Sequence, residues 1–150
     1  MFNFGNSYQN GDGVEKNESA AFEYHRRAAD LGHVQAIFSL GGSYYYGSGV
    51  EKNVSTGLEY YRRAADLGHV EAIFSLGVSY EYGRGVEKNE SAGLEFYRRA
   101  ADLGHVEAIF RLGVSYEYGS GVEKNESAAL EYYRRAADLG HVEAIFRLGV

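Results

Sequence analysis

Histidine recurs once in every 36 residues of this chain, and it is the residue type best suited to ligate a metal or to transfer a proton near neutral pH. The recurring positions are His33, His69, His105 and His141. Stacked helices lie about 8–10 Å apart, so histidines on neighbouring helices of a stack cannot share an ion that needs ligands at about 2 Å. No second column of ligands accompanies them. We therefore expect no metal site, and we expect each histidine near the C-terminus of the preceding helix, where the helix dipole favours a cation.

Paired arginines recur on the same step, and guanidinium groups bind carboxylates and phosphates in a forked geometry. A glutamate precedes each pair by three and four residues, as Glu95 precedes Arg98 and Arg99. That spacing places both charges on one side of a helix, so a solvated face of ion pairs is favoured over a ligand site. The corresponding glutamates of the neighbouring repeats are Glu59 and Glu131.

The glycine-rich segment GSGVEKN, at 47–53 and 119–125, has the composition of a phosphate-binding loop. It lacks the Gly-Lys-Ser/Thr ending of such loops and follows a predicted helix rather than a strand, so we predict a turn. Every polar residue type recurs as a column, whereas an active site requires different roles held together in one place. The sequence therefore predicts a protein that is not an enzyme and that needs no cofactor.

Composition and charge disfavour further classes of binding partner. The net charge is -6, from 21 acidic and 15 basic residues that are interspersed along the chain, and such a field repels nucleic acids and anionic bilayers. The absence of cysteine excludes disulfides and thiolate nucleophiles but leaves the compartment undetermined. No run of eighteen apolar residues and no basic leader before an apolar run is present, so we predict neither a membrane span nor a signal peptide.

A 36-residue repeat determines the elements that carry these residues. The motif GVEKN begins at Gly13, Gly49, Gly85 and Gly121. Units this short cannot bury an apolar face alone, so they must stack on one another. We predict one domain over 1–150 that consists of a truncated N-terminal repeat at 1–33, complete repeats at 34–69, 70–105 and 106–141, and an incomplete helix at 142–150.

The first half of each repeat is predicted to be an amphipathic helix. In the segment that begins at Val70, Ala72, Leu76 and Tyr80 recur every four residues and form one apolar stripe. Gly83 is expected to end this helix, because a residue without a Cβ adopts the left-handed cap conformation at little cost.

The second half of each repeat is predicted to be a helix that Asn89 caps in the third repeat. Leu94 and Tyr97 lie on its core side, and Gly104 ends it. The short link to the next repeat allows only an antiparallel hairpin, so we predict an all-α solenoid of stacked antiparallel hairpins. A column that is always Gly or Ala predicts close helix crossing; it comprises Ala21, Gly57, Gly93 and Ala129.

Each capping asparagine is also part of an Asn-x-Ser motif. The four are Asn17, Asn53, Asn89 and Asn125. They would accept glycans in a eukaryotic secretory pathway. Helix capping accounts for the asparagines without glycans, so the motif alone does not indicate glycosylation.

The repeat pattern, with A-x-x-x-L-G-x-x-Y-x-x-G-x-G-V followed by Y-R-R-A-A-x-x-G, resembles the Sel1-like repeat, a relative of the tetratricopeptide repeat. It runs through Ala36–Gly68, Ala72–Gly104 and Ala108–Gly140. The family often has Asp before the second helix and Trp within it. Here Asn and Tyr or Phe occupy those places and preserve capping and bulk. The resemblance implies a right-handed α-solenoid that serves as an adaptor for other proteins, and it does not imply catalysis.

A second apolar stripe on the first helix of each repeat indicates a partner-binding face. At 100° per residue, Phe74 and Val78 lie about 160° from Leu76. In the related tetratricopeptide superhelices this face lines a groove, so we predict a phenylalanine ladder with glutamates at its edges. An alternative is that neighbouring helices bury these rings. The predicted groove residues are Phe38, Phe74, Phe110, Val78, Val114, Glu71, Glu81, Glu107 and Glu117.

The two ends of the sequence are expected to behave differently. The N-terminal copy carries the polar residues of a solvated cap, namely Asn3, Asn6, Gln9, Asn10 and Asp12. The segment 142–150 is too short to persist alone as a helix, and it is apolar. We predict self-association through it. The residues concerned are Ala144, Ile145, Phe146, Leu148 and Val150.

Two functions follow from these patterns. The leading prediction is a non-enzymatic scaffold that binds a protein or peptide partner through the first-helix face and the open solenoid ends. The alternative is a structural protein that assembles head to tail and laterally into filaments or tubes. A fragment of a longer repeat protein would explain the ragged ends equally well. Neither prediction involves nucleic acid, a membrane span or a cofactor.

Overall fold

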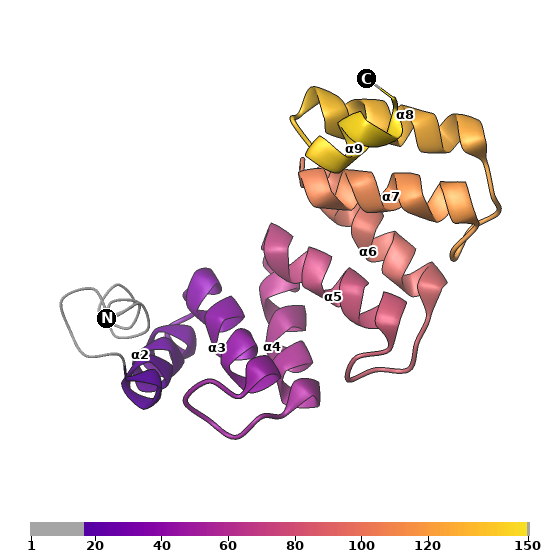
Figure 1. The fold of residues 1–150 in the computed structure, drawn as a ribbon. Helices are drawn as coiled ribbons and strands as arrows, with labels where there is room; N and C mark the ends of the chain where they lie inside the picture. The colour runs from indigo at the N-terminus through magenta and orange to yellow at the C-terminus, as the bar shows by residue number, and fades with distance from the viewer. Residues whose placement is uncertain (1–16, 150) are drawn as a thin grey trace. The chain divides into compact units, whose positions relative to one another are not determined.

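The structure, a computed structural model, describes residues 17–149, and every element in that part of the chain is an α-helix (Figure 1). The helices are α2 (Glu18–Asp30), α3 (Val34–Tyr46), α4 (Val54–Asp66), α5 (Val70–Tyr82), α6 (Glu90–Asp102), α7 (Val106–Tyr118), α8 (Glu126–Asp138) and α9 (Val142–Arg147). We call the first helix of each repeat A-type (α3, α5, α7, α9) and the second helix B-type (α2, α4, α6, α8). None of the described helices is long and apolar enough to cross a membrane.

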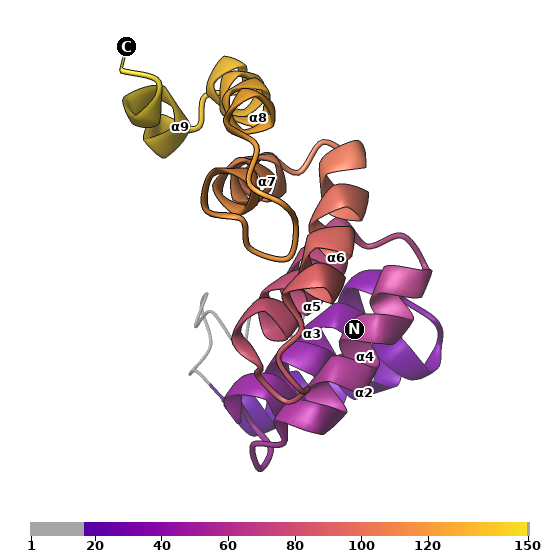
Figure 2. The same cartoon turned by 90° about the vertical axis from the view of Figure 1, so that its right-hand side faces the viewer.

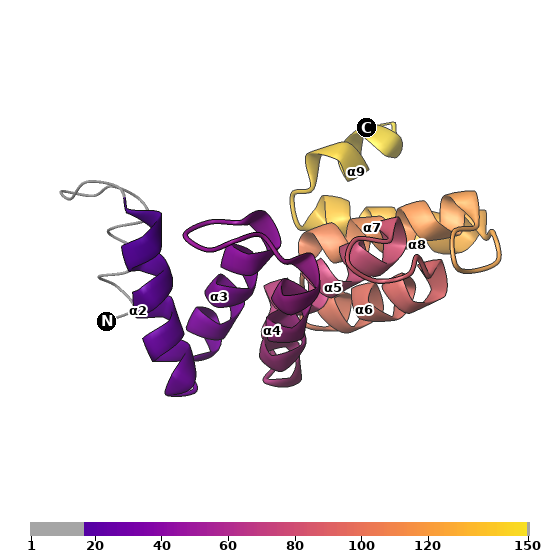
Figure 3. The same cartoon turned by 90° about the horizontal axis from the view of Figure 1, so that it is seen from below.

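The chain divides into two compact units, residues 1–72 and 73–150, and each is described by itself. In the first unit, α3 packs against both α2 and α4 (Figure 3). In the second unit, α7 packs against both α6 and α8, and α9 packs against α8 (Figure 2). Both α3 and α7 thus contact B-type helices on two sides, which is the nesting that short repeats require to bury their apolar faces.

Asparagine begins each B-type helix, as predicted. Asn89 has extended backbone angles (φ -152°, ψ 95°), and its side-chain oxygen accepts a hydrogen bond from the N–H of Ala92 at 3.0 Å. Leu103 and Gly104 end the same helix, with Gly104 at φ 85°. Such a cap satisfies backbone groups that have no partner inside the helix.

Histidine begins the A-type helices, which corrects the role predicted for it. In His33, His105 and His141 the ring Nδ1 accepts a hydrogen bond from the backbone N–H three residues later, at 3.1–3.2 Å. The ring therefore caps the N-terminus of the following helix rather than the C-terminus of the preceding one. An accepting Nδ1 requires a neutral imidazole whose proton is on Nε2, so dipole attraction of a cation is not the reason for this residue.

Close crossing at the small-residue column is confirmed. A Cβ atom on Gly93 would lie 2.9 Å from the carbonyl oxygen of Gly77, so the two helix backbones nearly touch there. Opposite this point, Tyr97 of the B-type helix packs its ring on Gly77, where a Cβ would lie 2.7 Å from the ring. Tyr97 is 1% exposed and is among the largest fully buried side chains of the described residues.

Two adjacent glycines in α3 test this packing. A Cβ on Gly41 would lie 2.6 Å from the Tyr61 ring, whereas the nearest atom to a Cβ on Gly42 is the Tyr61 hydroxyl at 3.6 Å. We expect Gly41→Ala to lower the free energy of unfolding by about 1–3 kcal/mol through overpacking. Gly42→Ala should raise it by up to about 1 kcal/mol through helix propensity. Urea denaturation of both variants measures the difference, and equal effects of the same sign would contradict the packing.

Candidate functional site

The predicted phenylalanine ladder takes part in the packing between repeats. Each ring stacks on the histidine that begins the next A-type helix and lies against a tyrosine of its own repeat. In the first unit, Phe38 lies 5.1 Å from the Tyr61 ring and 4.5 Å from the His69 ring, measured between centroids. In the second unit, the Phe110 ring lies 5.6 Å from Tyr133 and 4.2 Å from His141.

Burial of these rings varies along the chain. Phe110 is 7% exposed, whereas Phe38 and Phe74 are half-buried. Phe74 stacks on His105 at 4.5 Å. Neighbouring helices therefore cover most of each ring, and Phe38 and Phe74 keep only part of their surface exposed.

The predicted edge glutamate Glu81 lies in a polar cluster that joins α5, α6 and α7. The hydroxyl of Tyr97 donates to Glu81 at 2.8 Å, and Arg111 donates to Glu81 at 3.2 Å and to the Tyr82 hydroxyl at 3.0 Å. Arg111 also donates to Glu107 at 3.3 Å. Burial, together with the charge of Glu81, raises the pKa of Tyr97, so its hydroxyl stays protonated and acts as the donor.

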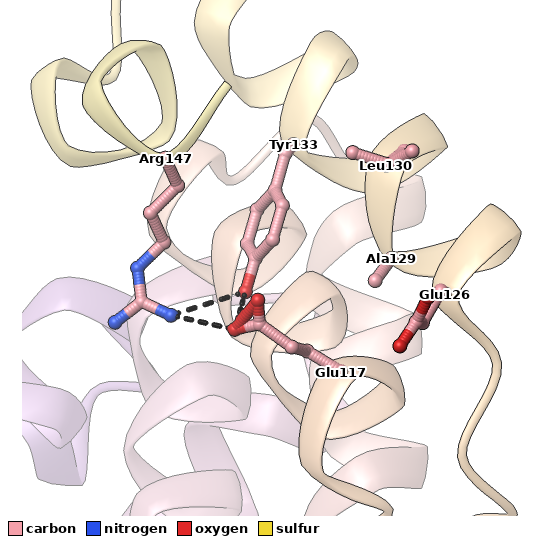
Figure 4. A pocket seen from close by; sticks show the side chains of 6 residues that line it. All are labelled: Glu117, Glu126, Ala129, Leu130, Tyr133 and Arg147. Carbon is pink, nitrogen blue, oxygen red and sulfur yellow. Dashed lines mark hydrogen bonds and ion pairs between the residues drawn. The ribbon is translucent and has the colours of Figure 1, made fainter. Parts of the chain in front are cut away.

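The same cluster recurs one repeat later, at the wall of a pocket of about 200 Å³ (Figure 4). The side chains of Arg147 and Tyr133 converge on Glu117, at 2.9 Å and 3.0 Å, and the Arg147 guanidinium lies over the Phe110 ring at 5.4 Å. Burial raises the pKa of Tyr133 to about 12. The pocket is lined by Glu117, Glu126, Ala129, Leu130, Tyr133 and Arg147.

Sequence reasoning missed the two arginines of these clusters. The sequence did contain a signal for them, because the pair Glu81 and Arg111 recurs 36 residues later as Glu117 and Arg147. Tyr45 stands 36 residues before Glu81, where an aromatic residue replaces the carboxylate. Tyr45 is buried and packs against Tyr61 with a centroid distance of 5.7 Å. Glu81 and Glu117, which were predicted to lie at the edge of a groove, therefore also form ion pairs that contribute to packing between helices.

The outward stripe of the A-type helices in the second unit keeps apolar side chains in contact with solvent. Tyr82 and Tyr118 are 54% and 64% exposed, and Val78 and Val114 are half-buried. The bond from Arg111 to the Tyr82 hydroxyl links α7 to α5 beside this stripe. We name the set Val78, Tyr82, Val114 and Tyr118 the A face. Glu71 is exposed but belongs to the first unit.

The predicted self-association residues are only partly accessible. Ala144 is fully buried, while Ile145 and Leu148 are half-buried. Phe146 is 76% exposed. Val150 and the polar residues predicted to cap the N-terminus lie outside the described part of the chain.

The other sequence candidates are placed as follows. Arg98 pairs with Glu95, and Arg134 pairs with Glu131 at 3.1 Å, as the solvated-face interpretation predicts. Arg98 additionally donates to the Tyr116 hydroxyl at 2.8 Å, which ties α6 to α7. Among residues 17–149, no group of three or more His, Cys, Asp or Glu side chains is arranged to hold a metal ion.

Comparison with known proteins connects this geometry to a repeat family. The model of a family described as Sel1 repeat matches residues 1–33, 34–69, 70–105 and 106–141. A search of curated proteins gave no match to this chain.

Several solved structures share the fold. A Sel1 repeat protein from Oxalobacter formigenes is 33% identical, with a TM-score of 0.92 over 96% of this chain and 59% of its own. A protective antigen of uropathogenic Escherichia coli, displaying an SLR fold, is 31% identical, with a TM-score of 0.93 over 99% of this chain and 32% of its own. Helicobacter pylori cysteine rich protein B is 27% identical, with a TM-score of 0.67 over 90% of this chain and 97% of its own.

These matches establish an all-helical repeat solenoid as the fold of the chain. The chain spans less than two thirds of the length of the first two of these proteins, 59% and 32%.

Two phenylalanines at the same repeat position, one buried and one exposed, test whether the ring stabilises the fold by packing. Phe110 is 7% exposed and Phe146 is 76% exposed. We expect Phe110→Ala to lower the free energy of unfolding by about 3–5 kcal/mol, because it removes the ring between His141 and Tyr133. Phe146→Ala should change it by no more than about 0.5 kcal/mol. Urea denaturation compares the two, and a Phe110→Ala variant as stable as the parent would contradict the stacking.

Proposed function

The chain belongs to the Sel1 repeat family, whose members are generally protein-interaction scaffolds, and on this premise we propose that it is a non-enzymatic scaffold that binds a protein or peptide segment on its A face. The observation that carries the proposal is the exposure of Tyr82 and Tyr118, at 54% and 64%. Large aromatic side chains that recur at the surface beside half-buried valines are the composition of a binding surface.

The packing beneath this face supports a preformed site. On one helix, residues three, four and seven positions apart lie on one side, so Arg111, Val114 and Tyr118 form a continuous row on α7. The row on α5 is held beside it by the bonds of Arg111 to Glu81 and Tyr82. A surface that is already ordered loses little conformational entropy when it binds a partner.

Charge indicates the chemistry of the partner. Glu107 and Glu143 pair with Arg111 and Arg147, yet their side chains remain 40% and 52% exposed. The whole chain carries a net charge of -6. A segment with aliphatic side chains for the valines and tyrosines, and with lysine or arginine for the carboxylates, is complementary to this face.

Panning a library of random short peptides against the purified chain tests the proposal. We expect enriched peptides that combine aliphatic and basic residues and whose affinity falls with added salt. The double variant Tyr82→Ser, Tyr118→Ser should raise Kd at least about tenfold in fluorescence anisotropy, because exposed aromatic anchors contribute most of the binding energy.

A matched control uses Leu103→Ser with Leu139→Ser. These leucines are 55% and 57% exposed and end the B-type helices of the same unit. Their removal should change Kd by no more than about twofold. An equal loss in both double variants, or no enrichment of any peptide, would rule out the A face as the binding surface.

Self-association through α9 is a second candidate. The exposure of Val142 and Phe146, at 79% and 76%, favours it, since both project from one short helix. A head-to-tail contact of this kind that does not close produces filaments.

Sedimentation of the chain at increasing concentration tests this candidate. We expect the mass to grow with concentration and the double variant Val142→Ser, Phe146→Ser to remain monomeric, because it removes the exposed apolar surface. The leucine control described above should assemble like the parent. A parent chain that stays monomeric throughout would eliminate the candidate.

A further inference from the structure

The histidines that join consecutive repeats form a repeated arrangement that the binding function does not use. We call it the histidine clasp, and the His69 clasp illustrates it. Nδ1 of His69 accepts the N–H of Ala72 at 3.2 Å, and Nε2 lies 2.7 Å from the side-chain oxygen of Gln35. The ring also stacks on Phe38, with centroids 4.5 Å apart. One imidazole thus caps the start of α5 and holds it to α3.

The clasp requires a single protonation state. Because Nδ1 accepts from a backbone N–H, the ring proton must lie on Nε2, where it donates to Gln35. A second proton on Nδ1 would point at the Ala72 N–H, so two donors would face each other and the cap would be lost. The added charge would also lie at the positive end of the dipole of α5.

We propose that the His69 clasp makes the junction between its two repeats sensitive to acid, and that it opens more readily than the His141 clasp. The His69 and His141 clasps differ in the side chain that faces Nε2. His69 faces the neutral amide of Gln35, whereas Nε2 of His141 lies 2.6 Å from the carboxylate of Glu107. A carboxylate compensates the charge of a protonated ring and an amide does not.

The surroundings of His69 determine whether acid stabilises or destabilises the clasp. From α3 the ring faces Gln35 and Phe38, both neutral, and from its own helix it feels the charge of Glu71. Burial lowers the pKa of His69 below the ordinary value of 6.5, and the charge of Glu71 opposes this only in part.

The unfolded chain therefore binds the proton more tightly than the folded chain. The stability that the clasp contributes is complete above about pH 6.5 and is lost as the pH falls through the folded-state pKa.

The second histidine with a lowered pKa must be removed from the comparison. His25 is 1% exposed in α2, and burial lowers its pKa as well. Tyrosine occupies the corresponding position of the later repeats, at Tyr61, Tyr97 and Tyr133. The variant His25→Tyr therefore supplies a parent in which His69 can be assessed alone.

Urea denaturation at pH 7.5 and pH 5.5 tests the clasp, since this range lies above the ordinary pKa values of Asp and Glu, about 3.9 and 4.3. In the His25→Tyr parent we expect the urea midpoint to fall on acidification. Adding His69→Asn should reduce that fall, because asparagine caps a helix without titrating. His33, His105 and His141 are present in both proteins, so their contributions cancel in the comparison.

A second measurement keeps the test independent of folding. Titration of the His69 ring by NMR in the full chain should give a midpoint below pH 6.5, and Gln35→Glu should shift that midpoint upward by supplying the carboxylate found beside His141. An unchanged acid response in His69→Asn, a midpoint at or above pH 6.5, or no shift in Gln35→Glu would overturn the proposal.

Discussion

The structure depends on the contact between a buried tyrosine ring of α4, α6 or α8 and a glycine of the preceding A-type helix. Tyr61, Tyr97 and Tyr133 approach Gly41, Gly77 and Gly113 so closely that no side chain fits between them. This approach brings the tyrosine hydroxyl to the carboxylates at the ends of α5 and α7 and the ring to the phenylalanine ladder. Both polar clusters and the ladder of the second unit are therefore arranged around these rings.

The contact between tyrosine and glycine does not require the polar clusters. The first unit packs Tyr45 against Tyr61 at the position where the later repeats have a glutamate. Tyr61, without that glutamate, is 4% exposed, comparable to Tyr97 at 1%. Burial of the ring thus does not require the ion pair, which adds polar contacts between neighbouring A-type helices.

The elements and their ends were predictable from the sequence, whereas contacts between repeats were not. Asn89 and Gly104 act locally, since capping depends on the residue type and on backbone N–H groups a few positions away. His69 and Arg111 reach partners 34 and 30 residues away in the preceding repeat, Gln35 and Glu81. Periodicity places such residues on a face of the helix but does not say which partner they reach. The phenylalanines combine both cases, because the apolar stripe predicts their helix face whereas only the neighbouring helices determine their burial.

The link between hairpins contains no spare residue. Leu67 closes α4, Gly68 turns the chain at φ 86°, and His69 already bonds to the first turn of α5. An inserted residue here would displace the imidazole from Phe38 and from Gln35. The segment from Arg84 to Lys88, by contrast, lies between the two helices of a hairpin and is mostly exposed. The repeat length is therefore constrained more tightly between hairpins, where the imidazole bonds on both sides of the link, than at the exposed residues inside a hairpin.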